Sequence, residues 1–281
     1  MAVALTYDKL DETQKKNAAL INAALTKYGI TNPYLRAGIL AVVAKESAFT
    51  PIAEGYRYTI PRLRVVFSTE RLQNKSNNDL IKLLKVQPAN AGYGLKPADQ
   101  GRATDGVALF NLVYGGTWGA RNLGNTQAGD GYKYRGRGFN QNTGRGNYTM
   151  LTKKSGIDLV SNPDKMNDPA VAAEALAIYF ANGLAAGKNT IKETYGVSDQ
   201  SKIDTLRKGN DIAYHINAGI GKKNIAADTT GGYQQTLDSM SSYLKSLGDL
   251  TETQKKMGFG LIGLLALGGG IYYYLKMKKI I

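Results

Sequence analysis

The sequence predicts a mainly α-helical protein with one transmembrane helix near its C-terminus. Three observations lead to this fold class. Apolar residues recur at helical spacing in several segments, a glycine-rich stretch separates two groups of these segments, and a long uncharged run follows the last segment. We expect helices at residues 11–28, 32–47, 77–85, 144–155, 168–182, 202–216 and 233–247.

The first expected helix belongs to an N-terminal element, residues 1–31, which should pack on a main domain over residues 32–248. The second has a well-marked start, because Asn32 can cap it and Pro33 pre-sets its first turn. Both features favour a helix that begins at residue 32 or 33.

Glu46 is the most informative residue of this second helix. Leu35, Ile39 and Val42 form an apolar stripe, and Glu46 continues it at helical spacing, so its carboxyl group is predicted to face the core. A buried carboxyl group has a raised pKa, which suits a general acid that works near neutral pH. The spacing alone is also consistent with Glu46 ending the helix in a wet groove or pairing with an arginine.

A glycine-rich insert covers residues 114–146, where ten glycines alternate with tyrosine and arginine. Glycine allows the backbone to approach a ligand closely, and the aromatic and arginine side chains could line a cleft. Two nucleotide-binding patterns are excluded. Gly136 and Gly138 could begin a dinucleotide-binding fingerprint, but Gln141 stands where its third glycine would be. The run that ends at Lys188 lacks the spacing and the hydroxyl residue of a Walker loop.

The last helices are clearly delimited. Asp168 and Pro169 open one of them as cap and first turn, and Gly248 closes the helix at residues 233–247. A short linker, residues 249–256, then leads to the uncharged run.

The uncharged run covers residues 257–275 and is followed by a basic tail, residues 276–281. Its nineteen residues would span about 28 Å as a helix, which matches the hydrocarbon core of a bilayer. Lysines flank it on both sides, and three tyrosines lie near one end. Because the N-terminus lacks a secretory signal, we expect a single-pass protein held in a lipid bilayer by its C-terminal anchor.

The composition excludes several kinds of chemistry. The sequence has no cysteine and one histidine, His215, so thiolate and multi-histidine metal sites are absent and we expect no metal and no cofactor. Carboxylates remain as the natural acid and base. The formal net charge of +14 indicates a polyanionic neighbour or a lysine-rich solvated surface, and without a nucleic-acid motif we expect no nucleic-acid partner.

Five blocks of the sequence resemble glycoside hydrolase family 19, in particular its bacterial and phage endolysin branch. The likeness covers roughly residues 30 to 225, and its most specific block contains the run from Gly131 to Gly138. The blocks are Lys45–Phe49, Glu54–Tyr58, Gly131–Tyr148, Asn162–Phe180 and Ile216–Gly219.

This resemblance implies a lysozyme-like, two-lobed helical fold that cleaves β-1,4 bonds of N-acetylated amino sugars with inversion. By position it implies that Glu46 is the general acid, Glu54 the general base and Thr143 a residue that positions the attacking water. It also implies sugar-binding roles, which fall on Gln141, Asn147, Asn217, Tyr134 and Arg137. Inversion needs two carboxyl groups with room for water between them.

Three departures from the family pattern are present. Lys45 stands where the family has histidine, one glycine is missing before Phe49, and Ala218 replaces a glycine. Lys45 could lower the pKa of Glu46 if its charge lies close. We expect His215 to be a structural or groove residue.

The combined expectation is a membrane-anchored peptidoglycan hydrolase, an endolysin or lysozyme-like enzyme of a bacteriophage, in a virion or host membrane with virion proteins as partners. Chitin is the other substrate that the resemblance implies. Two alternatives remain. Residues 46–53 are also similar to the opening of lytic transglycosylases, which use one glutamate, and a glycan-binding virion membrane protein without catalysis would retain the same blocks.

Overall fold

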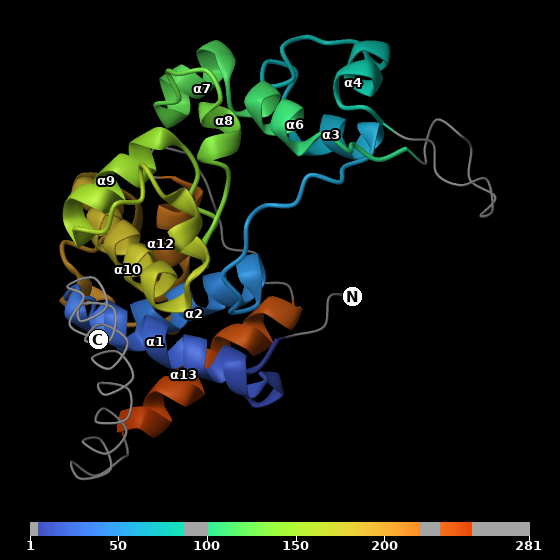
Figure 1. Ribbon diagram of the computed structural model, residues 1–281. Helices are drawn as coiled ribbons and strands as arrows, with labels where there is room; N and C mark the ends of the chain where they lie inside the picture. The colour runs from blue at the N-terminus through green and yellow to red at the C-terminus, as the bar shows by residue number, and fades with distance from the viewer. Residues whose placement is uncertain (1–4, 87–100, 220–230, 249–281) are drawn as a thin grey trace, which may run out of the picture. The chain divides into compact units, whose positions relative to one another are not determined.

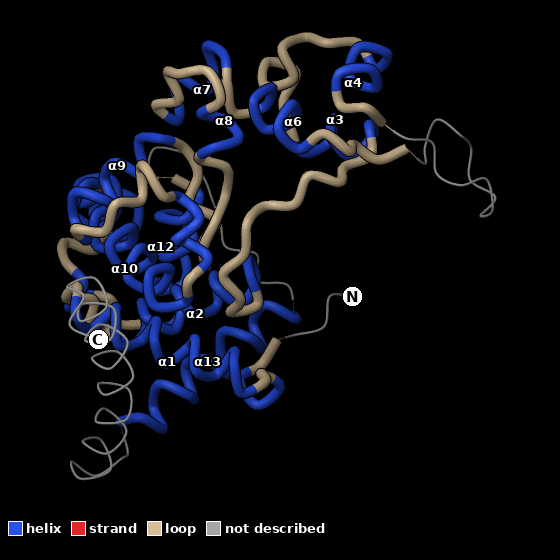
Figure 2. Tube along the Cα trace, viewed as in Figure 1, coloured by secondary structure: helices blue, strands red, loops and turns tan. Residues whose placement is uncertain are grey.

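The computed structural model describes residues 5–86, 101–219 and 231–248. Within these ranges the protein is mainly helical and contains no strand (Figure 2). The only extended pairings in this part of the chain are isolated bridges, Thr59 with Arg102 and Arg137 with Asn142. The predicted mainly α class is confirmed.

The chain divides into two compact units, residues 1–51 with 168–281 (unit 1) and residues 52–167 (unit 2). Unit 1 contains η1 (Tyr7–Lys9), α1 (Glu12–Lys27), α2 (Pro33–Ser47), α10 (Pro169–Ala186), α11 (Lys188–Tyr195), η3 (Gln200–Lys202), α12 (Leu206–Ala218) and α13 (Gly231–Gly248). Unit 2 contains α3 (Ile60–Val66), α4 (Asn77–Leu83), α6 (Gly106–Val113), α7 (Gly116–Leu123), α8 (Asp130–Lys133), α9 (Arg145–Ser155) and η2 (Pro163–Asn167).

Helix α2 is the central helix of unit 1 (Figure 1). The side chain of Asn32 caps it as predicted by accepting a hydrogen bond from the Leu35 amide, and Pro33 occupies its first turn. Residues on every side of the helix are buried, from Leu35 to Ala44, because α1, α12 and α13 all pack against it. One apolar stripe therefore understates how much of α2 is interior.

Two glycines let α2 and α12 approach each other at backbone distance. A Cβ atom on Gly38 would lie 2.7 Å from the Asn210 Cα atom, and one on Gly209 would lie 2.3 Å from the Tyr34 carbonyl. Both helices then run in the same direction from this contact. Because they rise equally per residue, the ends of α2 and α12 meet again about two turns later, at Glu46 and Asn217.

Helix α10 is longer than predicted. Asp168 caps it, but it continues past residue 182 to Ala186 because Gly183 lies inside it, not at its end. A Cβ atom on Gly183 would meet the Ile216 side chain at 2.4 Å, so this glycine allows α10 to pack closely on α12. Among the described residues, α10 is the one helix long and apolar enough to cross a bilayer, and its packing against α1 and α12 accounts for that composition.

Unit 2 is built around an aromatic and aliphatic core. Leu63, Leu80, Leu109, Phe110 and Val113 are fully buried in it. Phe110 of α6 stacks on Tyr114, whose ring also meets Phe67 edge to face. This core supports the loop that carries Glu54.

Several elements differ from the sequence prediction. The helix predicted at 202–216 begins at Leu206, after a 3-10 turn, because Thr205 caps it there. The glycine-rich insert contains α7 and α8 and is not entirely irregular. Helices α3, α6 and α11 were not predicted, since none exceeds eight residues and their apolar patterns are too short to show a period.

The predicted linker at 249–256, the transmembrane helix at 257–275 and the tail at 276–281 lie outside the described residues. The C-terminal anchor therefore stays a prediction from the sequence.

Candidate functional site

The end of α2 presents Glu46 at the surface of unit 1, which corrects the prediction that its side chain faces the core. Helix α2 ends at the next residue, Ser47, and Ala48 and Phe49 then both take positive φ angles, 47° and 58°. Side-chain amides of α1 hold this turn: Gln14 donates to the Ala48 carbonyl at 2.9 Å and Asn17 to the Phe49 carbonyl at 2.8 Å. Glu46 thus stands on a firmly anchored helix end.

The carboxyl group of Glu46 has one hydrogen-bond partner in the described residues, the Asn217 amide of α12, at 3.4 Å. The side chain is exposed at one side, but the protein around its carboxyl group excludes part of the water there, and this desolvation raises the pKa of Glu46. The charge of Lys45 opposes the rise but does not cancel it. The Lys45 ammonium lies over the Tyr214 ring, 5.1 Å from its centroid. The carboxyl group is therefore suited to carry a proton.

Glu54 is held inside unit 2 and is not a free surface glutamate. Its amide donates to the Gly136 carbonyl at 2.8 Å. The Tyr114 hydroxyl reaches both of its carboxylate oxygens, at 2.9 and 2.7 Å. Burial raises the pKa of Glu54, whereas bonds from Tyr114 and Gly136 and the charges of Arg71 and Arg135 act in the opposite direction. The protein thus supplies donors and positive charge to the ionised form of this residue.

Gln141 lies in a tight turn after Gly136, Thr143 follows that turn, and Asn147 lies in the first turn of α9. The backbones of Arg137 and Asn142 pair across the tight turn, and Gln141 takes a positive φ angle of 54°. Gln141 donates from its side chain to the Ile52 carbonyl at 2.9 Å and so ties the turn to the loop that carries Glu54. The Thr143 hydroxyl donates to the Gln141 carbonyl, and the Asn147 amide donates to the Thr143 carbonyl, both at 2.9 Å.

The structure thus brings Glu54, Gln141, Thr143 and Asn147 together in unit 2, and Glu46 with Asn217 in unit 1. The side-chain donors of Gln141, Thr143 and Asn147 each form a hydrogen bond to a backbone carbonyl. Asn217 differs from them, because its buried side-chain oxygen has no hydrogen-bond partner among the described residues. An oxygen of this kind can accept a bond from a ligand or from a protonated neighbour.

Tyr134 and Arg137 do not fit the predicted role in sugar binding. Tyr134 is 0% exposed and Arg137 is 1% exposed, so neither side chain can touch a glycan. The Tyr134 hydroxyl donates to the Val160 carbonyl, and the Arg137 guanidinium pairs with Asp164 at 2.8 Å. Both residues stabilise unit 2 from within.

Asp164→Asn is expected to destabilise the protein more than an ordinary surface ion pair would suggest. Removing the charge weakens a bond to a buried guanidinium, which costs about 1.5–3 kcal/mol in the free energy of unfolding. The matched change Asp204→Asn breaks an exposed pair with Lys208 and should cost about 0–1 kcal/mol. Urea unfolding followed by circular dichroism compares the two, and equal losses would contradict this reading of Arg137.

His215 is buried in α12, which agrees with the structural one of the two roles expected for it. Its Nδ1 atom lies 2.9 Å from the Tyr195 hydroxyl. In the described part of the chain no group of three or more histidine, cysteine or acidic side chains is placed to hold a metal ion.

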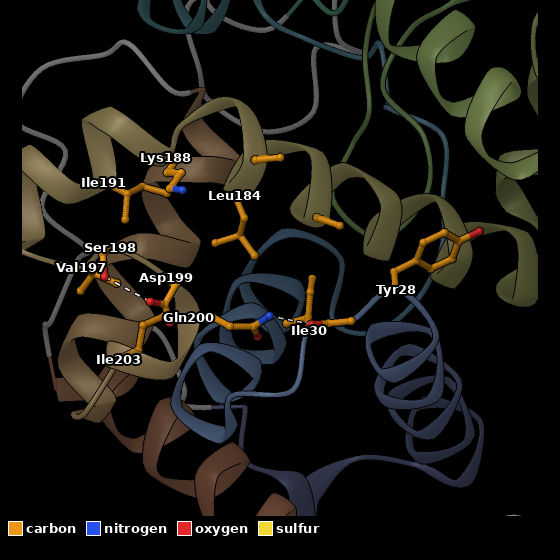
Figure 3. A pocket seen from close by; sticks show the side chains of 13 residues that line it. Tyr28, Ile30, Leu184, Lys188, Ile191, Val197, Ser198, Asp199, Gln200 and Ile203 are labelled. Atoms are coloured by element: carbon orange, nitrogen blue, oxygen red, sulfur yellow. Dashed lines mark hydrogen bonds between the residues drawn. The ribbon is translucent and has the colours of Figure 1, made fainter.

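A cavity of about 320 Å³ lies elsewhere in unit 1. It opens between the C-terminal part of α10, helix α11 and the turn before α2, and Ile30, Leu184 and Lys188 are among the residues that line it (Figure 3). None of the predicted site residues lines this cavity.

Two residues that the sequence did not single out belong to the Glu54 environment. Tyr114 binds the carboxylate directly, and Arg71 lies against the Tyr114 ring. No motif marks either residue, since they are distant from Glu54 in the sequence. Only the folded core brings them together.

No protein-family model matches the chain, and no curated protein sequence is significantly similar to it. The likeness to glycoside hydrolase family 19 therefore rests on the sequence blocks described above.

Proposed function

We propose that this protein is a membrane-anchored peptidoglycan hydrolase related to glycoside hydrolase family 19. Glu46 acts as the general acid and Glu54 as the general base of an inverting reaction on the β-1,4 bonds of N-acetylated amino sugars. The role is lysis or cell-wall entry by a bacteriophage, with the chain held in a virion or host membrane by residues 257–275.

The environment of Glu54 carries this proposal. A glutamate in a loop is ordinarily exposed, but Tyr114 binds both oxygens of this one, Gly136 holds its backbone, and two arginines lie near it. These contacts fix the carboxylate in one place, and the donors and positive charges offset part of the rise in pKa that burial causes, which is what a general base needs from its surroundings.

The environment of Glu46 supports the complementary role. Burial raises the pKa of Glu46, so its protonated form persists at higher pH than that of an ordinary glutamate. A carboxylic acid in this state can donate a proton to the glycosidic oxygen as the bond breaks. Meanwhile Glu54 takes a proton from the attacking water, whose oxygen bonds to the anomeric carbon. Exchange with solvent then restores both glutamates.

The net charge of +14 favours an anionic wall polymer such as peptidoglycan over neutral chitin. Long-range attraction to a polyanion would speed encounter and weaken with added salt. The predicted anchor would keep the hydrolase close to a wall that lies against the membrane.

A lytic transglycosylase that uses Glu46 alone is the second candidate. This reaction needs one glutamate. Glu46, its partner Asn217 and the contact that anchors the end of α2 all belong to unit 1, and this observation favours the second candidate. In that reaction the C6 hydroxyl of the same sugar attacks the anomeric carbon as the glycosidic bond breaks. The leaving oxygen takes a proton, the hydroxyl loses one, and a 1,6-anhydro end forms without added water.

Mass spectrometry of the products distinguishes these functions. The full chain in detergent is incubated with purified peptidoglycan and, separately, with chitin oligomers. Hydrolysis gives reducing ends that carry one added water, and NMR of early products should show the inverted anomer. Anhydro ends would establish the transglycosylase reaction, and intact substrate in both incubations would favour a glycan-binding protein.

Gly136→Ala provides a test that keeps both glutamate residues and changes the position of the Glu54 carboxylate. The added Cβ atom would lie 2.8 Å from the Gln141 Oε1 atom and 3.1 Å from the Glu54 Oε2 atom, so both flexible side chains must shift. Because small misplacements of reacting groups are costly, we expect kcat to fall by about 10- to 100-fold with little change in melting temperature.

The matched control for this change is Gly55→Ala. Gly55 is next to Glu54, yet a Cβ atom there meets nothing within 4 Å. Kinetics on labelled peptidoglycan fragments should show nearly normal turnover for Gly55→Ala. Equal turnover of the two variants would show that the position of the Glu54 carboxylate is unimportant.

A further inference from the structure

Arg71 occupies an unusual position in unit 2, because its guanidinium lies among three aromatic rings. The guanidinium carbon is 4.5 Å from the Phe67 ring centroid, 4.9 Å from that of Tyr114 and 4.5 Å from that of Trp118. Its Nε atom donates to the Val113 carbonyl at 3.2 Å. In the described part of the chain, no carboxylate lies within ion-pair distance of Arg71.

The ring of Tyr114 links Arg71 to Glu54. This ring also stacks in parallel on Phe110, with centroids 5.7 Å apart. The Tyr114 carbonyl accepts a bond from the Asn125 side chain at 2.8 Å, so both the backbone and the ring of Tyr114 are fixed. The hydroxyl at the end of this fixed ring spans the two oxygens of Glu54.

Four side chains act electrostatically on Glu54 or are acted on by it: Tyr58, Arg71, Tyr114 and Arg135. Burial of Glu54 raises the pKa of its carboxyl group, and the charge of Arg71 opposes this rise. Burial and the nearby Glu54 charge raise the pKa of Tyr114, which keeps its hydroxyl protonated as a donor.

We propose that Arg71 is a positioning residue for the base of this enzyme: its aromatic clasp fixes the Tyr114 ring, and through the Tyr114 hydroxyl it holds the Glu54 carboxylate ionised and in one orientation. This assignment rests on the proposed function.

The arrangement is more than a packing solution. A side chain that only filled the space among three rings could be apolar, and an apolar residue would avoid the cost of placing a charge there without an acidic partner. The guanidinium instead gains cation–π attraction from each ring. It also places a positive charge near Glu54 that no ion pair within the described residues neutralises.

The test follows the ionisation of Glu54 directly by NMR. The full chain has seven glutamates, so carbon-13 labelling of their carboxyl groups gives few signals, and Glu54→Gln identifies the one that disappears. For Arg71→Met we expect the Glu54 signal to titrate at higher pH than in the unchanged protein. Arg71→Lys, which keeps the charge, should move it less.

Kinetics give the second readout. In Arg71→Met the acidic limb of the kcat/KM profile should move to higher pH, with a loss on the order of tenfold below the optimum, since each pH unit changes the ionised fraction tenfold. Arg62→Met is the control, because this exposed arginine of α3 carries the same charge and is not among the groups that act on Glu54.

A third variant keeps the test decisive if Arg71→Met does not fold. Tyr114→Phe retains the ring and removes the hydroxyl, so Glu54 should titrate at higher pH. In the double variant with Arg71→Lys, the titration of Glu54 should move little further. An unchanged Glu54 titration in folded Arg71→Met, or in Tyr114→Phe, would overturn the proposal. If the unchanged protein cleaves no glycan, the proposed function fails, while the titration still decides the relation of Arg71 to Glu54.

Discussion

Glu46→Gln is expected to lower kcat on peptidoglycan by about 10²–10⁴-fold, because glutamine cannot donate the proton that the leaving oxygen needs. The loss should depend on the leaving group. On an aryl glycoside whose leaving group departs without protonation, the variant should retain most of its activity. Comparing the two substrates therefore tests the role of Glu46 as an acid.

The pH dependence of the unchanged protein gives a second check on Glu46. Its carboxyl group must be protonated to act, so activity falls as pH rises through the pKa of Glu46. Burial raises that pKa, and this limb should therefore lie above the pH at which an ordinary glutamate loses its proton. The limb should be absent from the profile of Glu46→Gln measured with the activated substrate.

Glu193→Gln is the matched control for this variant. Glu193 is exposed on α11, so the same chemical change should leave kcat and melting temperature unchanged. Normal cleavage of peptidoglycan by Glu46→Gln would rule out both reactions proposed for this residue, since the transglycosylase reaction uses it as well.

The sequence predicted the start of α2 well but misplaced its last turn. Asn32 and Pro33 act through local geometry, which a sequence displays directly. The direction of Glu46 depends on what surrounds α2. Three helices cover α2, so its apolar residues lie on several faces and not on one stripe. Extending a single stripe to Glu46 therefore predicted a buried side chain where the structure has an exposed one.

The pairing of Glu46 with Asn217 needed more than local patterns. The two residues are 171 positions apart, and they meet because Gly38 and Gly209 allow two parallel helices to touch. A lone glycine within a helical segment reads as a weak point of the helix. Here it marks the crossing that brings the two residues together.

Motif residues of unit 2 show a different limit of sequence reasoning. Tyr134 and Arg137 lie in the most specific block of the family resemblance, and they are buried structural residues. Tyr114, which binds Glu54, lies at the edge of the glycine-rich insert, 60 residues from it. A motif records which residues occur together, whereas burial and partners decide which of them a substrate can reach.

Glu54→Gln should reduce hydrolysis by about 10²–10⁴-fold while leaving the fold intact, because the amide cannot take a proton from water but can still accept the Tyr114 hydroxyl bond. Glu70→Gln is the control in unit 2; it weakens only an exposed pair with Arg121, at 2.7 Å, and should leave kcat unchanged. The smaller variant Glu54→Ala should regain turnover with added azide, which needs no deprotonation and would give a glycosyl azide of inverted configuration. Full activity of Glu54→Gln with anhydro products would show instead that Glu46 works alone and that Tyr114 orients a carboxylate that the reaction does not use.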